Sequence, residues 1–159
     1  MFSMVDLAAL APLARRFADY AFARHPEWRA LATLAPAEWE GPGVLAVTLR
    51  SPRGDRALEV FGEADRVTVG FGTATDHWHG HYEPWPDDPT SEAAVFAEAL
   101  ETVAGLLAET RVIFTLYEAD GRPTTFGIAE AGERPDYPGT HRIEFRSWLG
   151  TRDASMFPG

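Results

Sequence analysis

The chain has no cysteine. A disulfide framework, a thiolate metal site and a cysteine nucleophile are therefore all excluded. Lysine, asparagine and glutamine are absent as well, so all 14 basic residues are arginine. This bias, together with the abundant alanine, is more typical of a GC-rich bacterial genome than of a particular function.

Long apolar runs are also missing. No stretch reaches the roughly 18 apolar residues that a transmembrane helix needs. The apolar N-terminal stretch is interrupted by Arg15, Arg16 and Asp19 and has no basic segment before it. We therefore interpret it as a helix of the mature fold and not as a signal sequence. The expected location is the cytoplasm, without membrane contact.

Positive charge is scarce. The chain has 24 acidic residues against 14 arginines, which gives a formal net charge of −10. Such a charge repels phosphate backbones and so disfavours nucleic-acid binding. It favours electrostatic steering toward a basic protein partner, although an acidic surface can also serve solubility alone.

The hydrophobic pattern predicts one domain over residues 1–159. Helical periodicity predicts helices over 4–24 and 91–109. Short β-rich segments between turns predict a strand meander over 44–82 and further strands over 112–148, with a loose tail over 150–159. The short connections favour antiparallel pairing. The predicted fold is α+β, an antiparallel sheet of about six to seven strands with two amphipathic helices packed on one face.

Residues 76–83 read DHWHGHYE and hold three of the chain's five histidines at alternate positions. Side chains on a strand point to opposite faces in turn. If 77–82 is a strand, His77, His79 and His81 share one face, whereas Trp78 and Tyr82 share the other.

A metal site is one interpretation of this segment. Imidazole is the commonest metal ligand, and a His-x-His pair on a strand can place two nitrogens on one ion. Glu83 follows the strand and can add a carboxylate. His77, His79, His81 and Glu83 are therefore candidate ligands for a divalent transition metal such as zinc, iron or nickel.

A binding surface without metal is the favoured interpretation. The histidine face, with the nearby aromatic residues Trp78, Tyr82 and Trp85, is then the region that meets a protein or small ligand. A solvent-facing side of the sheet with no further role is the third alternative. A second candidate patch runs over 146–153, where Trp148 either completes a pocket with the histidine face or closes the edge of the core.

The spacing of His77, His79 and Glu83 resembles the first motif of the cupin family. The resemblance implies a metal-dependent enzyme that uses His77, His79, His81 and Glu83. The chain departs from the motif because Gly70 and Gly72 straddle the position of its glycine. A predicted helix also follows this segment, where cupins have strands between their first and second motifs.

A second resemblance covers roughly residues 40–153. It is carried by Gly70-Phe71-Gly72, Trp78-His79-Gly80-His81-Tyr82, the helix over 91–109, and Arg146-Ser147-Trp148 with Gly150, Thr151 and Asp153. These pieces resemble a set of small bacterial α+β proteins of unassigned function, some of which are similar to immunity proteins of toxin systems. The resemblance implies an acidic binding protein, which agrees with the charge of the chain.

Overall fold

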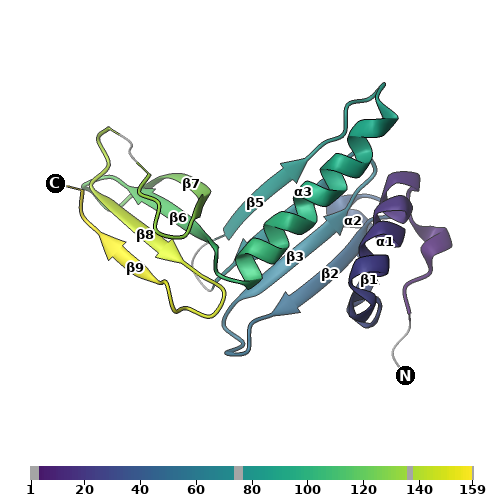
Figure 1. Cartoon of the computed structure of the whole chain (residues 1–159), viewed down its shortest axis with the longest axis horizontal. Helices are drawn as coiled ribbons and strands as arrows, with labels where there is room; N and C mark the ends of the chain where they lie inside the picture. The colour runs from purple at the N-terminus through teal and green to yellow at the C-terminus, as the bar shows by residue number, and fades with distance from the viewer. Residues whose placement is uncertain (1–3, 74–76, 136–137, 159) are drawn as a thin grey trace.

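The computed structural model describes residues 4–73, 77–135 and 138–158. These residues form an α+β fold with two antiparallel sheets, of five strands in the order β1-β2-β3-β4-β5 and of four strands in the order β7-β6-β8-β9. Figure 1 shows the two sheets side by side, with the long helices α1 and α3 over the five-stranded sheet.

The elements follow the chain in a simple order. The helical segments are η1 (Leu7–Ala9), α1 (Pro12–Arg24), η2 (Pro26–Ala30), α2 (Ala37–Glu40) and α3 (Pro89–Leu107). The first sheet is built from β1 (Ala32–Leu34), β2 (Leu45–Arg50), β3 (Ala57–Gly62), β4 (Val67–Gly72) and β5 (His77–Tyr82). The second sheet is built from β6 (Arg111–Tyr117), β7 (Pro123–Glu130), β8 (Arg142–Arg146) and β9 (Ala154–Met156).

The main core lies between the five-stranded sheet and the helices α1 and α3. Alternate residues of the strands, such as Val60 and Val69, face the helices and are fully buried. Phe17 of α1 meets Phe96 of α3 there, with ring centroids 5.2 Å apart. The prediction that both helices pack on one face of the sheet is confirmed.

The helices begin at different residues from those predicted. The first starts at Pro12 and not at residue 4, because the residue before a proline avoids the helical region and proline suits the first helical position. The preceding turn is a short 3-10 helix, η1, capped by the Asp6 side chain. The second starts at Pro89, and the carboxylate of Asp88 accepts a hydrogen bond of 2.9 Å from the Thr90 amide.

The prediction of a single sheet of six to seven strands is wrong. The predicted strand segments over 44–82 and 112–148 are present, but β6–β9 pair only among themselves in the described residues. The reason is α3, whose 19 residues run about 28 Å. The helix carries the chain from β5 along the first sheet, so β6 starts a new sheet beyond its end (Figure 1).

The tail over 150–159 is also not loose throughout. Residues 154–156 form β9, which pairs with β8 so that Met156 lies opposite Ile143. Without β9, β8 would be an exposed edge with unpaired backbone groups. A three-residue strand carries too little pattern to be recognised in a sequence, which explains the omission.

The arrangement of two open sheets and two long helices differs from the double-sheet jelly roll of cupins. The cupin-like spacing of His77, His79 and Glu83 therefore occurs in a fold that differs from that of cupins. The helices of the described residues are too short or too polar to cross a bilayer.

Candidate functional site

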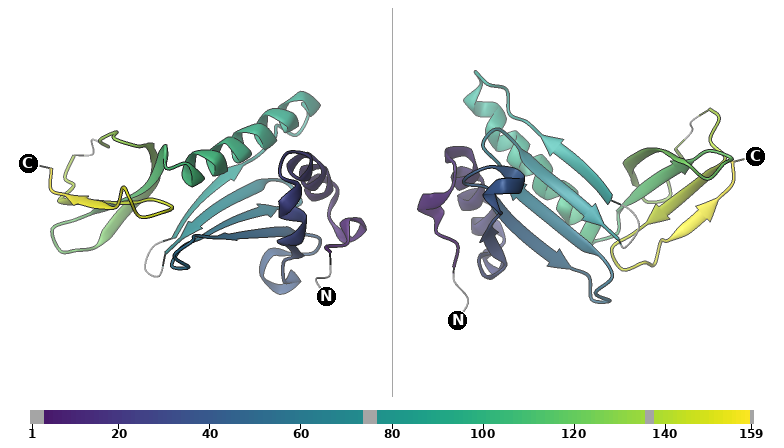
Figure 2. Two further views of the ribbon diagram at one scale, coloured as in Figure 1. Left: turned by 60° about the horizontal axis from the view of Figure 1, so that its bottom comes forward. Right: turned by 180° about the vertical axis from the view of Figure 1, so that it is seen from behind.

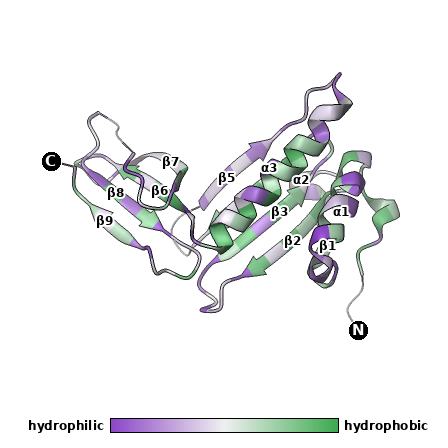
Figure 3. Cartoon of the chain, viewed as in Figure 1, coloured by the Kyte–Doolittle hydropathy of each residue, from purple (hydrophilic) through white to green (hydrophobic). Residues whose placement is uncertain are grey.

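The histidine segment forms β5, a strand at the edge of the five-stranded sheet. The predicted strand over 77–82 is confirmed to the residue. In Figure 3 this strand is hydrophilic, whereas β2, an inner strand of the sheet, is more hydrophobic. Asp76, the first residue of the DHWHGHYE segment, lies outside the described residues.

The two faces of β5 differ as predicted. His77, His79 and His81 are exposed on the face that points away from the helices. Trp78 is 8% exposed and belongs to the main core. The hydroxyl of Tyr82 lies 2.7 Å from the hydroxyl of Thr102 on α3, and burial raises the pKa of Tyr82. These aromatic residues therefore fix β5 to the core and leave the histidines available.

Gly70 and Gly72 of strand β4 lie beneath two of the histidine rings and together form the glycine floor. His77 lies opposite Gly72, and His79 lies opposite Gly70. A Cβ atom at Gly72 would lie 2.8 Å from Nε2 of His77, and one at Gly70 would lie 3.0 Å from Cδ2 of His79. The absence of side chains at these glycines lets both imidazole rings lie across β4 instead of standing upright.

His81 has a different environment from the other two histidines. Its Nδ1 lies 3.0 Å from Oγ1 of Thr68, the residue opposite it on β4. The Thr68 hydroxyl donates to the carboxylate of Glu63, so it can only accept from His81. This line of hydrogen bonds makes Nδ1 of His81 the donor to Thr68.

A hollow of about 220 Å³ opens beside His77 on the same face. Its lining includes Arg50 and Glu59, which the sequence reading did not single out, together with Asp55 and Arg56 from the turn between β2 and β3. Glu59 lies on β3 directly opposite Gly70. Gly70 therefore has His79 on one side and Glu59 on the other, a relation that depends on strand register and is not visible in the sequence.

The proposed ligand set His77, His79, His81 and Glu83 is not assembled in the structure. Glu83 is turned toward Arg66, with 3.7 Å between its carboxylate and the guanidinium. As the side chains lie, the described residues contain no group of three or more His, Asp or Glu arranged to hold a metal ion. The rings of His77 and His79 are neighbours, with centroids 6.1 Å apart and their planes perpendicular.

The two remaining residues predicted for the site, Trp85 and Trp148, lie in different parts of the structure. Trp85 is 76% exposed on the loop between β5 and α3. Trp148 is 6% exposed in the main core, where its ring centroid lies 6.5 Å from that of Phe71. Because Phe71 points to the helix side of β4, Trp148 lies on the opposite side of the sheet from the histidines.

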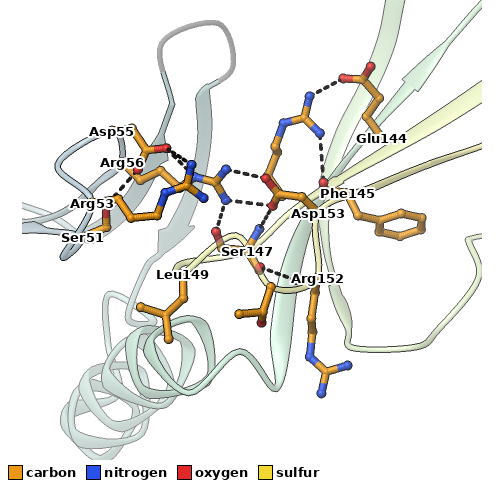
Figure 4. Close-up of polar contacts among 12 residues, drawn as sticks. Ser51, Arg53, Asp55, Arg56, Glu144, Phe145, Ser147, Leu149, Arg152 and Asp153 are labelled. Carbon is orange, nitrogen blue, oxygen red and sulfur yellow. Dashed lines mark hydrogen bonds and ion pairs between the residues drawn. The ribbon is translucent and has the colours of Figure 1, made fainter.

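The C-terminal patch over 146–153 joins the two sheets through Arg56 (Figure 4). The guanidinium of Arg56 donates to the carbonyl of Ser147 and to both oxygens of the Asp153 carboxylate, at 2.8 Å for Oδ1. The Ser147 amide donates to the same Asp153 carboxylate. Glu109, buried at the end of α3, accepts from the Leu149 amide and the Thr151 hydroxyl. This patch is therefore a structural junction.

Two carboxylates of the junction have altered acidity. Burial alone would raise the pKa of Glu109, but hydrogen bonds from Thr151, Ser147 and the Leu149 amide outweigh it, so the pKa is lowered. Burial opposes ionisation of Asp153 in the same way, and the hydrogen bond from Arg56 brings its pKa below the usual value. Both groups therefore favour the folded state in their charged form.

We expect the stability of the protein to fall in acid. A carboxylate with a lowered pKa contributes stability above the pKa of the unfolded chain, near 4, and loses it as the pH falls through the folded pKa. Urea unfolding at a series of pH values between about 7 and 3 should show this loss below about pH 5. Asp153→Asn should flatten the slope, whereas Asp87→Asn at an exposed position serves as control. An unchanged slope in Asp153→Asn would contradict the role of the junction.

Comparison of the sequence with protein-family models gave no match. Comparison with curated proteins and with solved structures gave none either.

Proposed function

We propose that the chain is a small acidic binding protein, similar in role to an immunity protein, which holds a protein partner on the outer face of its five-stranded sheet. The observation that carries the proposal is the row of three exposed histidines on that face, opposite the helices. The view from behind in Figure 2 shows this face turned toward the reader, with α2 at one end of it and β4 and β5 open.

The chemistry of the face suits a partner that is recognised by hydrogen bonds. Imidazole nitrogens can accept or donate, and Nδ1 of His81 is engaged by Thr68, which donates to Glu63 in turn. Trp85, exposed just beyond β5, adds a large amphipathic surface of the kind that is enriched at interfaces. The net charge of −10 favours a basic partner and accelerates its association.

The test is capture of a partner by matched variants of the full chain. Immobilised wild-type protein is compared with His79→Ala/His81→Ala and with His141→Ala, a histidine outside the row. The double variant should bind the captured protein at least ~10-fold more weakly, because two interface residues of this kind typically contribute more than 1 kcal/mol together. His141→Ala should bind like the wild type. The association rate should fall as salt is raised.

A captured protein that binds wild type and the double variant equally places the interface elsewhere and rejects the proposal. The same holds for a protein whose capture depends on His141, because that residue contacts Phe157 near the C-terminus and lies just before β8 of the second sheet.

A further inference from the structure

The geometry points to a transition-metal site formed by His77, His79 and Glu59 over the glycine floor of β4, with a zinc-like divalent ion as its ligand. This ligand set differs from the one that the sequence suggested, because Glu59 takes the place of Glu83. The site goes beyond partner binding and does not depend on it, since a free ion can be bound by the chain alone.

The two histidines are close to the separation that a shared ion requires. Zinc binds imidazole nitrogen at about 2.0–2.1 Å, so two imidazoles on one ion have ring centroids roughly 5 to 6 Å apart. The centroids of His77 and His79 are 6.1 Å apart. For His77, Nε2 is the ring atom nearest to the glycine floor, and for His79, Nε2 lies 3.3 Å from the Cβ position of Gly70. A small rotation of the exposed rings closes the remaining gap.

Glu59 faces this pair across the floor. It lies opposite Gly70 on β3, and His79 lies opposite Gly70 on β5. Strands two positions apart in a sheet are about 10 Å apart, and with no side chain at Gly70 the two long side chains can lean toward each other. Glu59 is half-buried, and its carboxylate makes no hydrogen bond or ion pair with another of the described residues.

Gly70 and Gly72 are thus the feature that makes the site. Side chains at these two positions would occupy the space above β4 over which the rings of His77 and His79 lie. Two histidines and a carboxylate are a ligand set that suits zinc and iron. Three protein ligands leave a coordination position open to water or to a group from a bound molecule.

The charged groups that line the hollow beside His77 balance one another. Arg56 and Arg50 also line the hollow beside His77. The guanidinium of Arg56 is paired with Asp153, however, and Asp55 lies 3.7 Å from its Nε. With Glu59 and Asp55 in the lining, the hollow holds as many carboxylates as guanidinium groups before Asp153 is counted.

Zinc titration of the tag-free full chain, stripped with a chelator, tests the site by calorimetry. The wild type should bind one ion per chain. His79→Ala and Glu59→Gln should each weaken binding at least ~10-fold, since even outer-shell changes at metal sites commonly have that effect. Glu83→Gln and His81→Ala, matched changes outside the set, should leave the affinity within about twofold of the wild type. Gly70→Val keeps every ligand but fills the floor, and it should abolish binding.

Several outcomes overturn the inference. They are the absence of one-to-one zinc binding, a loss in Glu83→Gln or His81→Ala without a loss in Glu59→Gln, and undiminished binding by folded Gly70→Val. If Gly70→Val does not fold, as judged by circular dichroism, the Glu59→Gln result decides whether the site exists. Glutamine has nearly the same shape as glutamate, and position 59 is half-exposed, so this variant should fold. Partner capture repeated with a chelator present separates this inference from the proposed function, since either can fail while the other holds.

Discussion

Replacing Arg56 by methionine should lower the free energy of unfolding by about 3 kcal/mol, near the lower end of the range for breaking a buried ion pair from one side. The Arg56 side chain is 8% exposed, and it joins the turn between β2 and β3 to both the Ser147 carbonyl and the Asp153 carboxylate. Methionine fills much of the same volume, so the loss measures the polar contacts more than a cavity. The Asp153 side chain keeps 28% exposure, which allows water to replace part of what is lost.

Arg53→Met is the matched control for this change. Arg53 lies three residues earlier in the same turn, is 61% exposed and approaches Asp55 at 3.6 Å. Exposed pairs of this kind contribute about 0–1 kcal/mol. Urea unfolding of both variants, followed by circular dichroism, should therefore separate them by about 2 kcal/mol or more. Equal midpoints for the two variants would show that the junction does not hold the sheets together.

A double-mutant cycle sharpens the result. Asp153→Asn alone removes the charge that Arg56 neutralises, and the double variant removes both. Because the two groups share hydrogen bonds, we expect the effects to be non-additive, with a coupling of about 1–3 kcal/mol. The same cycle between Arg53 and Asp153, which share no hydrogen bond in the described residues, should be additive within about 0.5 kcal/mol.

The junction also shows where sequence reasoning ends. Helices, strands and the alternation of β5 follow from local periodicity, and the faces of His79 and Trp78 could be predicted from it. The contact between Arg56 and Asp153 joins residues 97 positions apart, and no local pattern encodes it. The sequence did mark the segment over 146–153 as unusual, but it could not distinguish a structural junction from a binding pocket.

The candidate site, too, could be predicted only in part from the sequence. The histidine row was found from its spacing, whereas its surroundings depend on which residues of β3 and β4 lie opposite it. Gly70, Thr68 and Glu59 reach the histidines only through strand register. Glu83 was selected because it is near in sequence, but it turns to Arg66. Proximity along the chain is thus a weaker guide than register on a sheet, because pairing brings Thr68 beside His81 although the two are 13 positions apart in the sequence.

Trp148→Ala should destabilise the protein by about 3–5 kcal/mol, the range for removing a large aromatic side chain from a core. Trp148 follows β8 of the second sheet, yet its ring packs in the main core at 6.5 Å from Phe71 of the first sheet. Truncation therefore leaves a cavity at the place where the two sheets meet. Trp148→Phe keeps part of the ring and should lose less.

Trp85→Ala is the control that separates core from surface. Trp85 is 76% exposed, and a change at such a position is expected to alter stability by no more than about 0.5 kcal/mol. If Trp85 belongs to the binding surface, its loss should instead weaken partner capture without moving the unfolding midpoint. Tryptophan fluorescence offers an independent check, because loss of the exposed ring removes long-wavelength emission and loss of the buried ring removes short-wavelength emission.

The opposite pattern would assign Trp148 to the site. If Trp148→Ala keeps the wild-type unfolding midpoint and loses partner capture, Trp148 is a surface residue that contacts the partner. Its ring is then not part of the core in solution. If stability falls and capture by the remaining folded protein is unchanged, the two tryptophans have separate tasks. Trp148 then holds the second sheet against the first, and the histidine face binds without it, as the placement of Phe71 on the helix side of β4 requires.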